Sequence, residues 1–110
     1  MKLAIRGSRD IVINNIADYL PEGISEIVSG GARGIDRIAA NYARKNGIKL
    51  VEFLPDYDKY GKGAPLKRND LIAEYADEAI AFWNGKSRGT IYTIRAFQRL
   101  GKKVKILKTI

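Results

Sequence analysis

The sequence predicts an α/β fold in which helices cover both faces of a five-stranded parallel sheet. Five short apolar runs alternate with four segments whose apolar residues recur at helical spacing, a pattern typical of repeated strand–helix–strand units. Glycine-rich turns join several of these elements. The 110 residues are enough for one hydrophobic core and too few for two, so we expect a single domain over residues 1–110.

The strands are predicted where apolar runs lie between turn signals. They are expected at residues 2–6, 24–28, 48–54, 77–83 and 103–107. In the last run, lysines alternate with aliphatic residues, which suits an edge strand that must remain soluble. Right-handed crossovers with one reversal after the first strand give the strand order 3-2-1-4-5.

The helices are predicted from their apolar stripes at residues 12–20, 34–45, 64–75 and 89–100. The first stripe ends at Pro21. The third helix has Leu66, Leu71, Ile72 and Tyr75 as candidate packing residues. Residues 55–63 are rich in turn formers and predict a loop, which is long for a compact α/β unit and therefore a candidate for function.

One glycine-rich turn, with the sequence SGGARGID from Ser29 to Asp36, lies between a predicted strand and a predicted helix. Backbone N–H groups at a helix start and the helix dipole favour a bound anion, and glycines allow close approach. The turn has neither the G-x-G-x-x-G spacing nor a Walker A motif. Gly85-Lys86-Ser87 also fails as a Walker A motif, because Ile80 stands where the first glycine is required. A tight turn without a ligand is the alternative.

The predicted topology places a ligand site beyond the carboxyl ends of the strands, where the strand order reverses. Residues 7–9, 29–33, 55–63 and 83–90 all follow strands and meet there. They include the only tryptophan, several arginines and most of the glycine turns. This convergence favours a binding site over a turn without a ligand.

The chain is basic, with a formal charge of +8. Residues 1–55 carry 8 basic and 6 acidic groups, whereas residues 56–110 carry 12 and 6, so the excess lies in the second half. A basic surface attracts phosphate-bearing partners, either nucleotides or nucleic acid, although solubility explains the same charge.

Two residue types are missing. Without cysteine or histidine, disulfides and the usual zinc and iron ligand sets are excluded, so we expect no metal site. Since no apolar run approaches the roughly 20 residues that span a bilayer, we expect a soluble, cytoplasmic protein without a membrane partner.

Four motifs carry a resemblance to a known family. They are Gly7-Ser8-Arg9, the SGGARGID block, Arg68-Asn69, and Trp83 with Ser87-Arg88-Gly89-Thr90. Together they resemble the SLOG superfamily of Rossmann-like nucleotide-binding proteins, and within it the small stand-alone branch related to YspA. DprA and the LOG (Lonely Guy) phosphoribohydrolases are more distant members. The resemblance covers nearly the whole chain and implies a Rossmann-like three-layer sandwich.

The resemblance implies that a nucleotide or nucleotide-derived ligand binds at the strand ends. Gly30, Gly31 and Gly34 would form a phosphate-binding turn, and Gly89-Thr90 would present a second helix N-terminus. The candidate ligand-binding residues are Gly7, Ser8, Arg9, Ser29, Gly30, Gly31, Arg33, Gly34, Asp36, Arg68, Asn69, Trp83, Ser87, Arg88, Gly89 and Thr90. No residue is assigned a catalytic role, and a bound nucleotide is the only cofactor considered.

For several of these residues the sequence allows more than one role. Arg88 is the preferred phosphate partner, because a guanidinium at a helix start offers bidentate geometry. Asp36 would orient Arg33, accept a ribose hydroxyl, or favour the first turn of its helix through the dipole. Trp83 would stack on a base or pack at its strand end, and Tyr57 and Tyr60 would close over a ligand.

Three functions fit these observations. The first is a sensor or processing module that binds a mononucleotide or a NAD- or ADP-ribose-like ligand. The second is a DprA-like protein that binds single-stranded DNA through a basic surface. The third is N-glycosidic hydrolysis of the LOG type. A homodimer is a further implication of the resemblance, for which Val104 and Ile106 on the outer strand offer a contact.

The hydrolase function depends on a carboxylate. LOG enzymes carry a glutamate in the motif P-G-G-x-G-T-x-x-E, and the matching position here is Thr93, which cannot act as a carboxylate base. Asp36, Asp56 and Asp58 are the candidate substitutes. Whether the protein is an enzyme is left open by the sequence.

Overall fold

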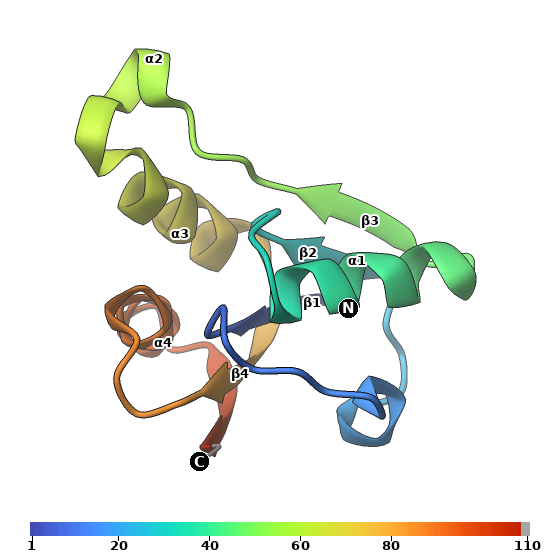
Figure 1. Cartoon of the computed structure of the whole chain (residues 1–110). Helices are drawn as coiled ribbons and strands as arrows, with labels where there is room; N and C mark the ends of the chain where they lie inside the picture. The colour runs from blue at the N-terminus through green and yellow to red at the C-terminus, as the bar shows by residue number, and fades with distance from the viewer. Residues whose placement is uncertain (109–110) are drawn as a thin grey trace.

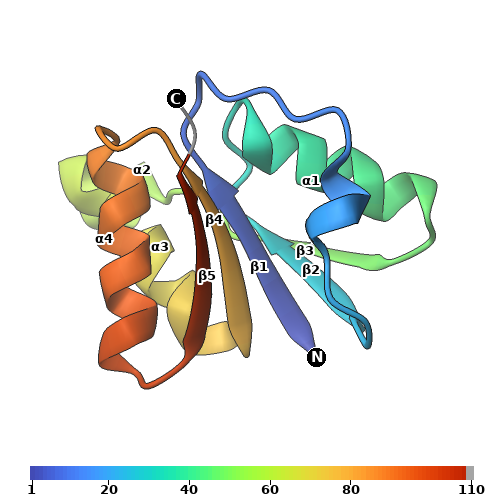
Figure 2. The same cartoon turned by 90° about the horizontal axis from the view of Figure 1, so that it is seen from below.

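The computed structural model describes residues 1–108 and confirms the predicted fold class. Five parallel strands form a sheet in the order β3-β2-β1-β4-β5, with helices on both faces (Figures 1 and 2). The last two residues of the predicted domain lie outside the described residues. The strands are β1 (Lys2–Gly7), β2 (Glu26–Ser29), β3 (Lys49–Glu52), β4 (Glu78–Trp83) and β5 (Lys103–Lys108).

The helices divide between the two faces of the sheet. Figure 2 shows α1 and η1 on one face and α3 and α4 on the other, while Figure 1 shows α2 extending away from the sheet. None of the helices within residues 1–108 is long and apolar enough to cross a membrane. The helical segments are η1 (Ile16–Tyr19), α1 (Ile35–Lys45), α2 (Tyr57–Tyr60), η2 (Gly61–Gly63), α3 (Ala64–Tyr75) and α4 (Arg88–Arg99).

The central strand β1 contributes to a core on each face. Leu3 and Ile5 belong to the cluster beneath α1, whereas Ala4 belongs to the cluster beneath α3 and α4. Successive side chains of a strand point to opposite faces of the sheet, which explains this division. A parallel sheet that is covered on both faces therefore needs apolar residues on both. The cluster beneath α3 and α4 is rich in alanine.

The register of β1 and β4 positions the candidate site. Gly7 pairs with Phe82, and the N–H of Ser8 donates to the carbonyl of Phe82 at 3.0 Å. The two strands therefore end side by side at the reversal of the strand order. The loops that follow them lie next to each other at the carboxyl edge of the sheet.

The predicted helix at residues 12–20 is wrong, because only the single 3₁₀ turn η1 forms there. Ile11 and Ile16 are the buried residues of this segment, whereas Val12 is 76% exposed. Positions five apart do not share one helical face. The β-branched residues 11–13 and the asparagines at 14 and 15 also have low helix propensity, so an extended connection that buries two isoleucines is favoured.

The predicted loop at residues 55–63 is also wrong in part, since it contains α2 and η2. Asp56 caps α2, and its carboxylate accepts from the N–H of Lys59 at 3.1 Å. The neighbouring prediction for Leu66 fails as well, because this side chain is 44% exposed. The buried face of α3 includes two polar residues, Arg68 and Asn69, and this unusual choice points to a site.

Candidate ligand-binding site

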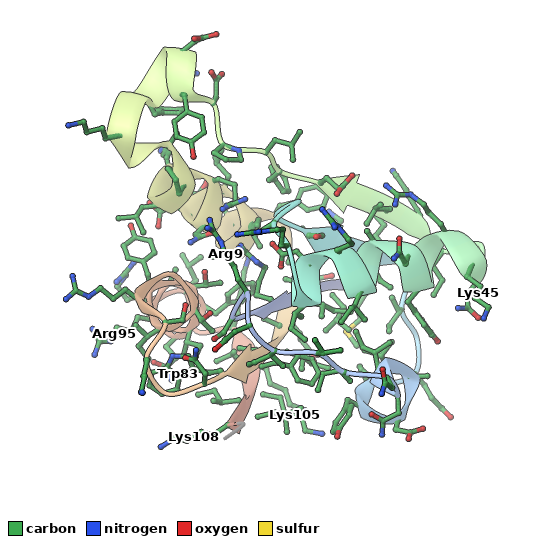
Figure 3. The ribbon with its side chains drawn as sticks, viewed as in Figure 1. Arg9, Lys45, Trp83, Arg95, Lys105 and Lys108 are labelled. Atoms are coloured by element: carbon green, nitrogen blue, oxygen red, sulfur yellow. The ribbon has the colours of Figure 1, made fainter. Side chains whose placement is uncertain are left out.

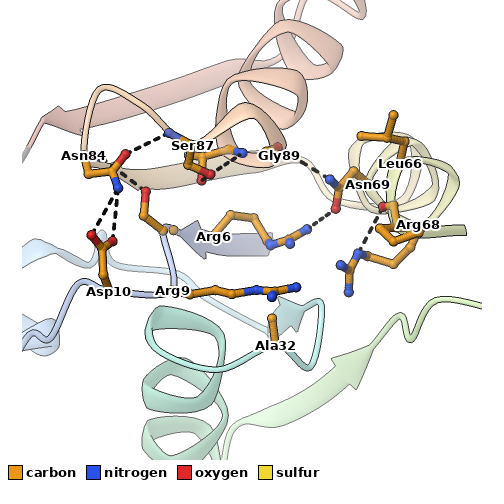
Figure 4. A pocket seen from close by; sticks show the side chains of 14 residues that line it. Arg6, Arg9, Asp10, Ala32, Leu66, Arg68, Asn69, Asn84, Ser87 and Gly89 are labelled. Carbon is orange, nitrogen blue, oxygen red and sulfur yellow. Dashed lines mark hydrogen bonds between the residues drawn. The ribbon is translucent and has the colours of Figure 1, made fainter. Parts of the chain in front are cut away.

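A cavity of about 400 Å³ opens at the carboxyl ends of β1 and β4, between the loop after β1, the start of α4 and one side of α3 (Figure 4). Its volume lies in the range of small-molecule sites, about 300–1,000 Å³. The lining residues are Arg6, Gly7, Ser8, Arg9, Asp10, Ala32, Pro65, Leu66, Arg68, Asn69, Asn84, Ser87, Gly89 and Thr90.

Arg6 lies in the wall of the cavity and is only 7% exposed. Its Nε donates to Oδ1 of Asp36 at 3.1 Å, which makes a buried ion pair, and its Nη1 donates to Oδ1 of Asn69 at 2.7 Å. The three residues come from β1, α1 and α3. This network therefore joins both helical layers beneath the site.

Arg68 is the second buried guanidinium and is also 7% exposed. Its Nη1 donates to the carbonyl oxygens of Gly30 and Phe53, the latter at 3.5 Å. The two guanidiniums flank the same glycine, since a Cβ at Gly30 would lie 2.8 Å from Nη1 of Arg68 and 2.9 Å from Nη2 of Arg6. Nη2 of each arginine has no hydrogen-bond partner within residues 1–108.

The electrostatics of this pair favour an anion. Burial and the neighbouring charge of Arg6 lower the pKa of Arg68 to about 10, and Asp36 offsets only part of this effect. Arg68 remains a cation at neutral pH. Of the two buried cations only Arg6 is paired with a carboxylate, and a ligand anion would stabilise the remaining charge. Arg9 extends alongside Arg6 across the cavity and adds to the positive potential (Figure 4).

The start of α4 forms the opposite wall. The hydroxyl of Ser87 accepts from the N–H of Thr90 at 3.2 Å and caps the helix, while Gly89 and Thr90 line the cavity. The positive end of the helix dipole therefore points toward the same space as the two buried arginines.

The structure brings only part of the predicted site together. The predicted residues that line the cavity are Gly7, Ser8, Arg9, Arg68, Asn69, Ser87, Gly89 and Thr90. Those that do not line it are Ser29, Gly30, Gly31, Arg33, Gly34, Asp36, Trp83 and Arg88. The second set includes nearly all of the glycine turn that the sequence singles out.

The glycine turn makes its polar and packing contacts with other parts of the protein. Asp36 is 1% exposed and pairs with Arg6 rather than with Arg33, and its Oδ2 accepts from the N–H of Ala32 at 3.2 Å. The backbone of Gly34 has φ of +76°, and a Cβ there would lie 2.7 Å from the carbonyl oxygen of Arg9. The turn is thus shaped by Asp36 and packs against the loop after β1.

The predicted aromatic residues do not line the cavity. Trp83 is half-buried, and its Nε1 donates to the carbonyl of Ser87 at 3.0 Å, which braces the turn before α4. Tyr57 is exposed on α2, and Tyr60 contacts the Lys59 and Lys67 ammonium groups at 5.2 and 5.7 Å from its ring centre. In the structure, Trp83 therefore packs at the end of its strand.

Six further residues line the cavity that are not among the candidates predicted from the sequence: Arg6, Asp10, Ala32, Pro65, Leu66 and Asn84. Arg6 carried a usable signal, because an arginine inside an apolar strand is buried only when paired or functional. Asp10 and Asn84 follow strand ends, as site residues in such folds do.

The residues considered for LOG-type hydrolysis do not line the cavity. Thr93, at the position of the LOG glutamate, is buried, and its hydroxyl donates to the carbonyl of Gly89 at 3.0 Å. Of the candidate substitutes, Asp36 is paired with Arg6, and Asp56 and Asp58 lie outside the cavity lining. Across residues 1–108 there is no group of three acidic side chains close enough to hold a metal ion.

Fold and site together define a Rossmann-like α/β protein with a cationic cavity at the reversal of the strand order. Residues 1–60 match the family model YAcAr, described as the YspA, cpYpsA-related SLOG family. The chain belongs to this family. It is also 36% identical over 102 residues to the Gene 61 protein of Mycobacterium phage D29, a match that covers 84% of this chain and 81% of the phage protein.

A solved structure shares the fold. The DNA processing protein A (DprA) of Streptococcus pneumoniae superposes with a TM-score of 0.80 at 22% identity, over 99% of this chain and 50% of that one. The present chain therefore spans half the length of that protein. At this level of identity the similarity establishes the common architecture.

Proposed function

We propose that the cavity binds the phosphate group of a nucleotide or nucleotide-derived ligand, either a mononucleotide or a compound of the ADP-ribose or NAD kind. The protein would act as a sensor or processing module for that ligand. One observation carries the proposal: Arg6 and Arg68 are buried side by side, Arg6 alone is paired with a carboxylate, that of Asp36, and the α4 N-terminus faces them. A phosphate accepts hydrogen bonds from both types of donor.

Membership of a SLOG family supports a ligand of this class, and the volume of the cavity supports a small molecule. The candidate contacts with phosphate are Nη2 of Arg6, Nη2 of Arg68 and the N–H of Gly89. Arg33 and Arg88, which the sequence also selects, are exposed and outside the cavity lining. They serve as internal controls for net charge.

The test is to measure binding of AMP, ADP-ribose and NAD by calorimetry for the wild type and two arginine variants. Arg68→Met should weaken binding about tenfold to a hundredfold, because a charge-assisted hydrogen bond is worth about 1.5–3 kcal/mol. Arg33→Met removes the same charge from an exposed position outside the cavity and should leave affinity unchanged.

A second pair of variants provides a test that does not depend on whether Arg68→Met folds. A Cβ at Gly89 meets no atom within 4 Å, so Gly89→Glu and Gly89→Gln should both fold. Glu would place a carboxylate at the phosphate site, and Gln is its uncharged control. Binding lost with Glu and retained with Gln supports the site. Equal losses from Arg68→Met and Arg33→Met, or no binding by the wild type, would contradict the proposal.

Single-stranded DNA is the second candidate ligand, and one observation favours it. Lys86 and Arg88 are exposed beside the cavity, and the Lys108 side chain lies against Gly85, 3.0 Å from a Cβ built there. Figure 3 shows Arg95, Lys105 and Lys108 extending from the outside of the molecule. Binding of an oligonucleotide that weakens steeply with salt, with no response to AMP, would favour this function.

A further inference from the structure

The cavity has an acidic end that phosphate binding does not use. Asp10 is the one acidic residue among the cavity-lining residues within 1–108. Figure 4 shows it beside Asn84 at one end of the cavity, with Arg68 and Leu66 at the other. A carboxylate repels phosphate, so this end must face a different part of the ligand.

The Asp10 carboxylate is held in place by the loop that begins α4. Nδ2 of Asn84 donates to both of its oxygens, at 3.1 and 3.3 Å. Asn84 is itself fixed, because its N–H donates to the hydroxyl of Ser8 at 3.2 Å and its Oδ1 accepts from the N–H groups of Lys86 and Ser87, both at 2.8 Å. A carboxylate positioned in this way needs no reorganisation to accept a hydrogen bond.

Asp10 retains the capacity to bind a ligand. A carboxylate has about four acceptor positions, and Asn84 fills two of them. Asp10 is exposed to the cavity rather than sealed by protein. A donor group on the ligand can therefore bind both oxygens while Asn84 stays in place.

We propose that Asp10 accepts hydrogen bonds from the hydroxyl groups of a pentose, so that the cavity selects a sugar phosphate unit rather than phosphate alone. This inference rests on the proposed function and deepens it. The phosphate lies at the Arg6–Arg68 end and the sugar hydroxyls lie at the Asp10 end. Asp10 is a specificity-determining residue, because it fixes the orientation of a ligand with an anionic group at one end and donors at the other.

The test compares inorganic phosphate with ribose 5-phosphate in the wild type and in Asp10→Asn. The asparagine keeps an acceptor for Asn84, so the loop is retained, but it loses the charge and one acceptor. We expect affinity for ribose 5-phosphate to fall about tenfold, in line with the loss of a charged hydrogen bond. Affinity for inorganic phosphate should stay equal or rise, since a repulsive charge has been removed.

Asp58→Asn is the matched control, because Asp58 is exposed on α2 and outside the cavity lining. It should leave the preference between the two ligands unchanged. If Asp10→Asn weakens both ligands equally, or neither, Asp10 only supports the loop and the inference fails while the proposed function stands. If the wild type binds AMP, phosphate and ribose 5-phosphate equally poorly, the proposed function fails with it.

Discussion

Two strand-to-helix turns of this protein are both rich in glycine and polar residues, and they differ in where their hydrogen bonds go. In the β2–α1 turn, the N–H of Gly31 donates to the Ser29 hydroxyl at 3.3 Å and that of Ala32 to Asp36. The carbonyl of Gly30 accepts from Arg68. This turn is bound mainly to the protein's own side chains.

The β4–α4 turn is also held by a side chain, that of Asn84, but it leaves its helix start open to the cavity. Gly89 and Thr90 line that cavity, whereas the glycines of the β2–α1 turn do not. The comparison shows that glycine content does not decide which turn opens to the cavity. What differs between the two turns is the set of partners that their backbone groups bind.

The largest effect is expected from removing the Asp36 carboxylate, which anchors the β2–α1 turn. Asp36→Asn should lower the free energy of unfolding by about 3–5 kcal/mol, because one amide oxygen cannot serve both the Arg6 guanidinium and the Ala32 N–H. Urea unfolding measures the change. Asp58→Asn, an equal charge change on an exposed residue, should cost less than about 0.5 kcal/mol. Similar values for the two variants would show that the buried pair adds little.

An alanine at each turn sharpens the comparison directly. Gly34→Ala should destabilise the protein by about 1–3 kcal/mol, since φ is +76° and the new Cβ would meet the Arg9 carbonyl. Gly89→Ala meets no atom within 4 Å and should be neutral or stabilise by up to about 1 kcal/mol. Thermal and urea unfolding of both variants test this. Equal losses would remove the distinction between a packed turn and an open one.

The smallest effect concerns the brace of the β4–α4 turn. Trp83→Phe removes the indole N–H that donates to the Ser87 carbonyl and should cost about 1 kcal/mol. Affinity for AMP should change little, because Trp83 does not line the cavity. Unfolding followed by circular dichroism and calorimetry with AMP give the two values. A large loss of affinity would instead support base stacking on the indole.

The strand pattern was predictable because apolar runs buried on both faces are read directly from sequence. Residues 2–6 and 77–83 became β1 and β4 within one residue at either end. The structure of residues 12–20 was not predictable in this way. Their apolar residues have a helical spacing, but the burial of Ile11 and Ile16 favours an extended connection instead of a helix. Tertiary packing overrides local periodicity there.

The location of the cavity was predictable to the extent that the fold fixes where the strands end. Ser8, Arg9, Ser87 and Gly89 followed from that rule, and they line the cavity. The rule could not indicate which arginine is turned inward. Arg68 is buried on α3 and lines the cavity, whereas Arg88, at the start of α4, is exposed and does not.

The network around Arg6 has a consequence for folding kinetics. Arg6 bonds Asp36 across 30 positions of sequence and Asn69 across 63. Contacts of such long range close large loops, and the entropy of loop closure makes them slow to form. The cavity wall is therefore assembled only when β1, α1 and α3 have docked. Recovery of the proposed ligand binding during refolding would report the docking of β1, α1 and α3 rather than the formation of any one segment.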